Sequence, residues 1–173
     1  HGENTISFHV ESNDAWLCAE VTITEDDDVD CTEPETEVEG NDCATGNDGE
    51  LDNYLTIFAW ADMCDEDGHA PGDNTYTPGC DTPLMEAPVK LADYVGRFPI
   101  VDSTFNAFGA VGEPLDGGKD YYIGVAWCFG DMSVDPETGE IACDGENVGN
   151  DAQTDTLKLD VSFEAVQARN NGN

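Results

Sequence analysis

Apolar and polar residues alternate along several short segments of this chain, and this pattern limits the fold more than any other feature. In HGENTISFHVES, at positions 1–12, the apolar side chains are Ile6, Phe8 and Val10, with polar residues between them. The same alternation occurs in AWLCAEVTI, at 15–23, and in DTLKLDVSFEAV, at 155–166. A period of two residues is typical of β-strands that bury one face.

Clusters of Asp, Gly, Pro and Asn separate these segments. LDNYLTIFAW, at 51–60, is apolar on both faces, which predicts a central strand, and YYIGVAWCFG, at 121–130, predicts another strand. The acidic segment 24–50 has little to bury and predicts a long loop, whereas Pro88 allows only a short helix within 89–95. We therefore expect an all-β sandwich of the jelly-roll or immunoglobulin-like kind, with long acidic loops.

The charge of the chain is strongly one-sided. It has 39 acidic and 5 basic residues, which gives a net charge of −34. Self-repulsion of this size predicts that folding requires screening, either by the salt of a halophilic habitat or by bound Ca²⁺. Nucleic acids and anionic membranes are excluded as partners, because both are bound through Lys and Arg.

The cysteine content points to an oxidising compartment. The chain has seven cysteines, begins with His and contains no apolar run of about 18 residues, which a membrane-spanning helix needs. We expect a secreted, extracellular or cell-surface protein from which a signal peptide has been removed, with no membrane insertion of the mature chain.

Three disulfides can be predicted from local spacing. Between Cys128 and Cys143, the segment DPETG is typical of a tight turn, and the resulting hairpin would bring these two cysteines opposite each other. Two further pairs would close the acidic loop and the loop after it, and one cysteine is then left over, whose partner can lie in another subunit. The two pairs are Cys31 with Cys43 and Cys64 with Cys80, and the odd residue is Cys18.

No motif of enzymatic catalysis is present, so we expect a protein that is not an enzyme. His1, His9 and His69 are isolated from one another, without the HExxH spacing of metallopeptidases, and GxSxG is absent. These histidines are interpreted as surface or strand residues.

An oxygen-rich segment, WADMCDEDGHAPGD at 60–73, is a candidate for Ca²⁺. Its possible ligands are Asp62, Asp65, Asp67 and Asp73, but their register does not fit an EF-hand, and an acidic turn is the alternative. A weaker candidate is formed by Asp26, Asp27, Asp28 and Asp30, because consecutive carboxylates point apart. No cofactor is required by any motif, and Ca²⁺ is the candidate ion.

Four segments resemble the TasA and camelysin family of secreted fibre proteins. They are CTEPE (31–35), NDGELDNYLTIFAWAD (47–62), YYIGVAWCFG (121–130) and CDGENVGNDAQTDTLKLDVSFEAVQARNN (143–171). Together they cover about half of the chain in the order found in the family.

The resemblance implies a jelly-roll-like β-sandwich that polymerises into an extracellular filament, pilus or biofilm matrix fibre. It implies that residues 1–12 are a donor strand and residues 13–173 a single sandwich domain. Ile6, Phe8 and Val10 would then fill a groove in the next identical subunit, an arrangement called donor-strand complementation. Lateral bundling of such acidic filaments is expected to require salt.

Other interpretations remain beside this one. The pattern alone favours pairing of residues 1–12 within their own domain as an ordinary first strand, because such pairing has no association cost. A monomeric calcium-dependent surface adhesion module is an alternative function, and a camelysin-type metallopeptidase is another.

Overall fold

The computed structural model describes residues 1–39, 49–66 and 68–169, and it confirms an all-β chain. The strands are β1 (Gly2–Val10), β2 (Ala15–Asp27), β3 (Leu55–Ala61), β4 (Thr82–Pro83), β5 (Val89–Lys90), β6 (Gly96–Val101), β7 (Lys119–Phe129), β8 (Asp131–Val134), β9 (Ile141–Asp144) and β10 (Thr156–Gln167). The helical segments are short: α1 (Glu33–Glu39), α2 (Leu51–Tyr54) and η1 (Leu91–Asp93).

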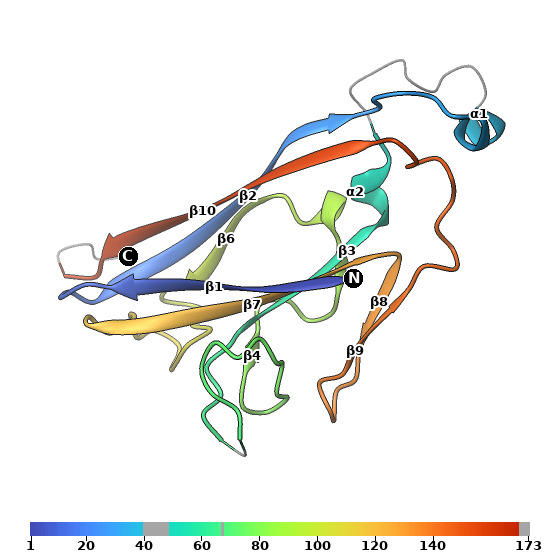
Figure 1. Cartoon of the computed structure of the whole chain (residues 1–173). Helices are drawn as coiled ribbons and strands as arrows, with labels where there is room; N and C mark the ends of the chain where they lie inside the picture. Colours follow the sequence, from blue (N-terminus) through green and yellow to red (C-terminus); the bar gives the residue numbers. More distant parts are fainter. Residues whose placement is uncertain (40–48, 67, 170–173) are drawn as a thin grey trace.

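Two antiparallel sheets face each other and form a β-sandwich (Figure 1). Sheet A has the strand order β1-β7-β3-β4, with β5 also paired to β3. Sheet B has the order β10-β2-β6. The predicted sandwich is therefore present, and β2 is the central strand of sheet B because it pairs with β10 on one side and β6 on the other.

The main core lies between the two sheets. Leu17 and Ala19 on β2 face Ile123 on β7, and all three are at most 7% exposed. The small residues Ala19 and Ala59 are buried in this core among larger side chains. This core is built from the alternating residues that the sequence pattern assigns to one face.

A second, smaller core covers the outer face of sheet A. Trp60, which is fully buried, packs there with Phe58 and with Tyr76, beneath the hairpin formed by β8 and β9. Gly124 makes room for the indole, because a Cβ at this position would lie 2.2 Å from the Trp60 ring. Since β3 is covered on both faces, its prediction as a buried central strand is confirmed.

Several boundaries differ from the sequence-based expectation. The acidic segment is not a loop from residue 24 onward, because β2 continues to Asp27 through its pairing with β10, where Lys158 forms an ion pair with Glu25. Part of the same segment is the helix α1. The predicted strand at 51–60 begins only at Leu55, because the polar residues before it form the turn of α2. The short helix expected after Pro88 is η1.

Two of the predicted disulfides are confirmed. Cys64 bonds to Cys80, and Cys128 bonds to Cys143 across the hairpin of β8 and β9. Among the described residues Cys18 is the free cysteine, as expected. The predicted bond from Cys31 to Cys43 involves a residue outside the described part of the chain.

Candidate functional site

β1 lies at the edge of sheet A, beside β7 (Figure 1). It pairs with β7 along its whole length, in an antiparallel register that runs from Gly2 opposite Trp127 to Val10 opposite Lys119. Among the described residues β1 has no strand partner on its other side. In a single chain the first strand therefore completes its own sandwich, and exchange between chains remains a prediction.

The inward face of β1 carries the side chains that the alternation assigns to it. Val10 is 8% exposed, and Ile6 and Phe8 are partly buried against the main core. His9 and Ser7 point outward and are exposed. Transfer of three such apolar side chains out of water contributes about 1.5 to 3 kcal/mol each when burial is complete.

Phe8 joins both sheets of the sandwich through its ring. Its ring centroid lies 5.7 Å from that of Tyr121 on β7 and 6.0 Å from that of Phe163 on β10. Phe108 meets it edge to face at 5.8 Å. Aromatic clusters of this geometry add to the stabilisation from buried area alone. Phe8 thus connects β1 to both sheets.

The beginning of β1 is fixed by a close contact with an aromatic ring. A Cβ at Gly2 would lie 2.4 Å from the ring of Trp127, its partner in the register. Only Gly fits beneath this indole without displacing it. The contact defines which residue of β1 stands opposite Trp127.

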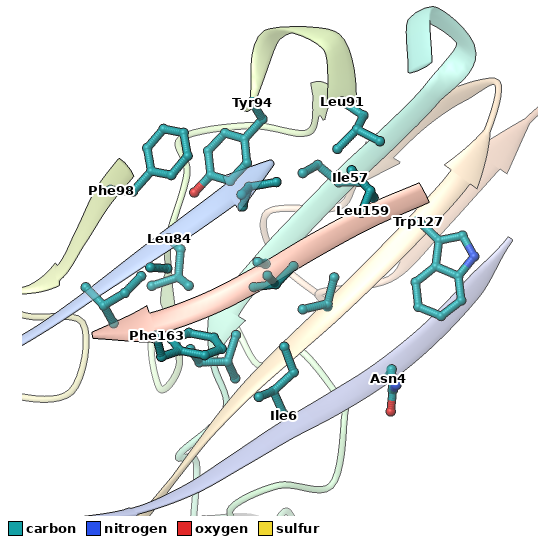
Figure 2. Close-up of a pocket in the computed structure, with 17 residues that line it drawn as sticks. Asn4, Ile6, Ile57, Leu84, Leu91, Tyr94, Phe98, Trp127, Leu159 and Phe163 are labelled. Carbon is teal, nitrogen blue, oxygen red and sulfur yellow. The ribbon is translucent and has the colours of Figure 1, made fainter. Parts of the chain in front are cut away.

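An apolar groove runs along the open side of the sandwich, between the edge strands β1 and β10. One part of it, with a volume of about 220 Å³, is lined by side chains of both sheets, including Ile6 on β1 and Leu159 on β10 (Figure 2). A second part, of about 440 Å³, lies near Phe8 and Phe163. The inner-facing residues of β10 are incompletely covered: Leu159 is 40% exposed and Val161 is 49% exposed. The sandwich is therefore open at the edge where β1 lies.

The link between β1 and β2 is short and is held by hydrogen bonds where it enters β2. Residues 11–14 are exposed and cross from sheet A to sheet B. Ala15 and Leu115 exchange backbone hydrogen bonds of 3.0 and 2.9 Å, and the Asp14 carboxylate accepts a hydrogen bond of 3.0 Å from the Gly117 N–H. Gly117 is required here, because a Cβ would lie 2.6 Å from the carbonyl carbon of Ser12. A few exposed residues thus join β1 to the rest of the subunit, the subunit body from Ala15 onward, whose first strand is anchored at Ala15.

The predicted Ca²⁺ ligands do not share one environment. Asp62 is fully buried and its Oδ2 accepts a hydrogen bond of 2.8 Å from the Asn74 N–H. Asp65 is exposed, and the Asp73 carboxylate accepts hydrogen bonds from the Thr75 and Ala70 N–H groups. Asp67 lies outside the described residues. A Ca²⁺ site in this loop therefore remains a prediction.

Asp62 should make the stability of the protein depend on pH. Burial raises the pKa of Asp62 above its ordinary value of 3.8; the hydrogen bond from the Asn74 N–H opposes this shift, and the negative charges of Asp81 and Asp73 add to it. The folded chain then keeps a proton that the unfolded chain loses, so this contribution to stability is present below about pH 4 and is lost as pH rises through the folded pKa. We expect Asp62→Asn, which cannot titrate, to gain stability relative to wild type as pH increases from 4 to 7.

Urea unfolding of both proteins at constant ionic strength checks this expectation. A difference in free energy of unfolding that stays constant over this pH range would contradict it.

A different acidic cluster is formed by Asp28, Glu35 and Asp155, of which sequence reasoning named only Asp28, as part of the weaker candidate. One carboxylate oxygen of each lies within 4.8 Å of the others. Burial raises the pKa of Asp155 to about 6, and the neighbouring carboxylates of Asp28 and Glu35 act in the same direction. No local spacing signals this cluster, because its members come from three separate segments.

The histidines each contact one acidic residue. His9 Nδ1 lies 2.7 Å from Asp120 Oδ1, and His69 Nδ1 lies 3.0 Å from Asp73 Oδ2. His1 Nε2 lies 3.7 Å from Glu3 Oε1. The group of three possible metal ligands found among the described residues contains no His.

Comparison with protein-family models, with curated proteins and with solved structures gave no match. The two disulfides indicate an oxidising, extracellular environment. Within the described residues, no helix has the length and apolar character needed to cross a membrane.

Proposed function

We propose that this protein is a structural subunit of an extracellular filament, in which β1 of one subunit pairs with β7 of the next. The observation that carries the proposal is the position of β1. It is an edge strand that lines an open apolar groove, and only the exposed residues 11–14 join it covalently to the rest of the chain. A linear polymer of identical subunits follows if each subunit gives its strand to one neighbour and receives a strand from another.

Exchange of this strand conserves the contacts that hold it. The ladder from Gly2–Trp127 to Val10–Lys119 and the ring contacts of Phe8 would form again between subunits. The balance between closed monomer and polymer then depends on the conformation of the link and on the loss of translational freedom, not on the strand contacts themselves. A high local concentration of subunits therefore favours the polymer.

The outer surface of the molecule is suited to an extracellular, saline setting. Its net charge of −34 keeps subunits soluble, and the disulfide across the hairpin of β8 and β9 fastens the cover over Trp60. Both features support a subunit that functions outside the cell.

A disulfide placed between β1 and β7 tests the proposal directly. His9 and Asp120 stand opposite each other, are exposed, and already touch through their side chains. In a chain with His9→Cys, Asp120→Cys and Cys18→Ser, oxidation of assembled material should give a ladder of covalent oligomers on a non-reducing denaturing gel. Reduction should return the ladder to monomer.

A matched control uses two strands of the subunit body. Glu20 and Ser162 are exposed partners on β2 and β10, so Glu20→Cys with Ser162→Cys in the same Cys18→Ser background should crosslink only within a chain. If the His9→Cys, Asp120→Cys chain also yields monomer alone, β1 pairs within its own subunit and the proposal fails.

A second candidate function is a monomeric calcium-dependent adhesion module. The acidic cluster of Asp28, Glu35 and Asp155, in which Glu35 is buried and the other two are partly buried, favours it. This alternative predicts a monomeric crosslinked product, and it predicts a sedimentation coefficient that is independent of protein concentration.

A further inference from the structure

Three acidic side chains from separate parts of the sequence meet at one end of the sandwich. Asp28 follows the end of β2, Glu35 lies on α1, and Asp155 precedes β10. β2 and β10 are paired up to Asp27 and Thr156, so the first and third of these residues leave the sheet side by side. Figure 1 shows α1 at this end of the molecule.

The carboxylate of Glu35 is inaccessible to solvent, and only one of its two oxygens has hydrogen-bond partners among the described residues. Its residue is 0% exposed, and its Oε2 accepts a hydrogen bond of 3.0 Å from the Thr32 N–H and lies 3.2 Å from the Thr154 hydroxyl. Its Oε1 is buried and has no hydrogen-bond partner among the described residues. A buried charged oxygen without a partner is strongly unfavourable unless a cation approaches it.

The other two side chains of the cluster also each have one buried oxygen that lacks a hydrogen-bond partner among the described residues. Oδ1 of Asp28 and Oδ1 of Asp155 are buried and lack a hydrogen-bond partner within the described part of the chain. No Lys or Arg of the described residues forms an ion pair with these three carboxylates. Each of the three neighbouring carboxylates thus has an oxygen without a hydrogen-bond partner, and no Lys or Arg of the described residues neutralises their negative charge.

The surrounding contacts hold the three segments together. The Thr154 hydroxyl lies 2.5 Å from the carbonyl oxygen of Asp30, and the Thr32 hydroxyl donates a hydrogen bond of 2.8 Å to Gln153 Oε1. The Glu50 N–H donates one of 2.7 Å to Asp155 Oδ2.

The backbone also packs tightly against the cluster. A Cβ at Gly49 would lie 3.2 Å from the Asp155 carboxylate, so a residue with a side chain would press on it. The carboxylates are therefore positioned by the fold and not merely neighbours on a flexible surface.

We propose that Asp28, Glu35 and Asp155 bind one Ca²⁺ ion, which joins the end of β2, helix α1 and the start of β10. All ligand atoms that these three residues offer are carboxylate oxygens, whereas Zn²⁺ sites are mostly built from Cys sulfur and His nitrogen. Ca²⁺ accepts six to eight oxygens in flexible geometry and suits ligands from three separate segments, whereas Mg²⁺ requires near-ideal octahedral geometry. The site is distinct from the strand β1 and does not depend on filament formation.

Calorimetric titration and thermal unfolding of the full chain test this site. Protein freed of cations with a chelator is titrated with CaCl₂ and, separately, with MgCl₂, in enough NaCl to screen the acidic surface. We expect one saturable Ca²⁺ site per chain, and an increase in Tm of about 5 to 10 °C at a Ca²⁺ concentration about 100 times the Kd.

Two ligand variants and one control separate this site from general binding to the acidic surface. Glu35→Gln and Asp155→Asn keep the side-chain shape and should each weaken Ca²⁺ binding by about tenfold or more. Glu137→Gln removes one exposed carboxylate at the turn between β8 and β9 and should leave both binding and the Tm shift unchanged. Because Gln and Asn remove repulsion between carboxylates, both ligand variants should fold without Ca²⁺, which circular dichroism verifies.

The proposal is overturned if wild type shows no saturable site above the surface background. It is also overturned if both ligand variants bind like wild type, or if Mg²⁺ saturates the site and Ca²⁺ does not.

Discussion

A chain that lacks residues 1–12 is expected to form no fibres under conditions in which the full chain does. Removal of β1 takes away the donated strand and uncovers the edge of β7, where Tyr121 and Ile123 are otherwise 5% and 3% exposed. Electron microscopy of both proteins in molar salt, where the Debye length is about 3 Å and repulsion is screened, checks this result. Fibres from the truncated chain would show that β1 is not the link between subunits.

A peptide of residues 1–12 distinguishes loss of the link from loss of the fold. Without β1 the truncated chain is expected to be less stable, because apolar residues of its core are uncovered. The peptide should restore its thermal stability by pairing with β7, and it should not restore fibres, since it is not attached to a second body. Restored fibres would contradict the proposed arrangement.

Replacement of Phe8 by Ala is expected to lower the free energy of unfolding of the closed chain by about 3 kcal/mol, the low end for such a substitution because the ring is partly buried. The change removes ring contacts with Tyr121, Phe108 and Phe163 and so separates β1 from both sheets. Urea unfolding at low protein concentration measures the effect. The same variant should also reduce the yield of fibres, because the donated strand would carry the same defect.

Ser7→Ala is the matched control for Phe8→Ala. Ser7 is the neighbouring residue of β1 but is exposed on the outer face, so its replacement should change stability by less than about 0.5 kcal/mol. Equal effects of the two substitutions would mean that the inward face of β1 does not hold the strand in place.

Local sequence patterns were sufficient to predict β1, β2, β3, β7, β10 and the hairpin of β8 and β9, whereas β4, β5 and β6 were not predicted. Alternation assigns Ile6, Phe8 and Val10 to the inner face because a strand turns its side chains to opposite sides at every step. The Cys128–Cys143 disulfide could be predicted because both cysteines flank one tight turn. In both cases the determining contacts are close in sequence.

The acidic segment shows what such patterns miss. Its TEPE sequence, at residues 32–35, forms a capping box in which Glu35 accepts a hydrogen bond from the Thr32 N–H, and this signal could have predicted the start of α1. The extension of β2 to Asp27 had no such signal, because it depends on pairing with β10 more than 100 residues later. The acidic cluster has the same origin, since Asp155 reaches Asp28 only through that pairing.

The length of the link between β1 and β2 restricts the mechanics of any filament built by strand exchange. From Val10 to Ala15 the chain can span at most about 18 Å when fully extended. The body that gives a strand must therefore lie directly against the body that receives it, because Ala15 is anchored to Leu115 and supplies no slack. Successive subunits would be unable to rotate freely relative to each other, and the filament would resist bending.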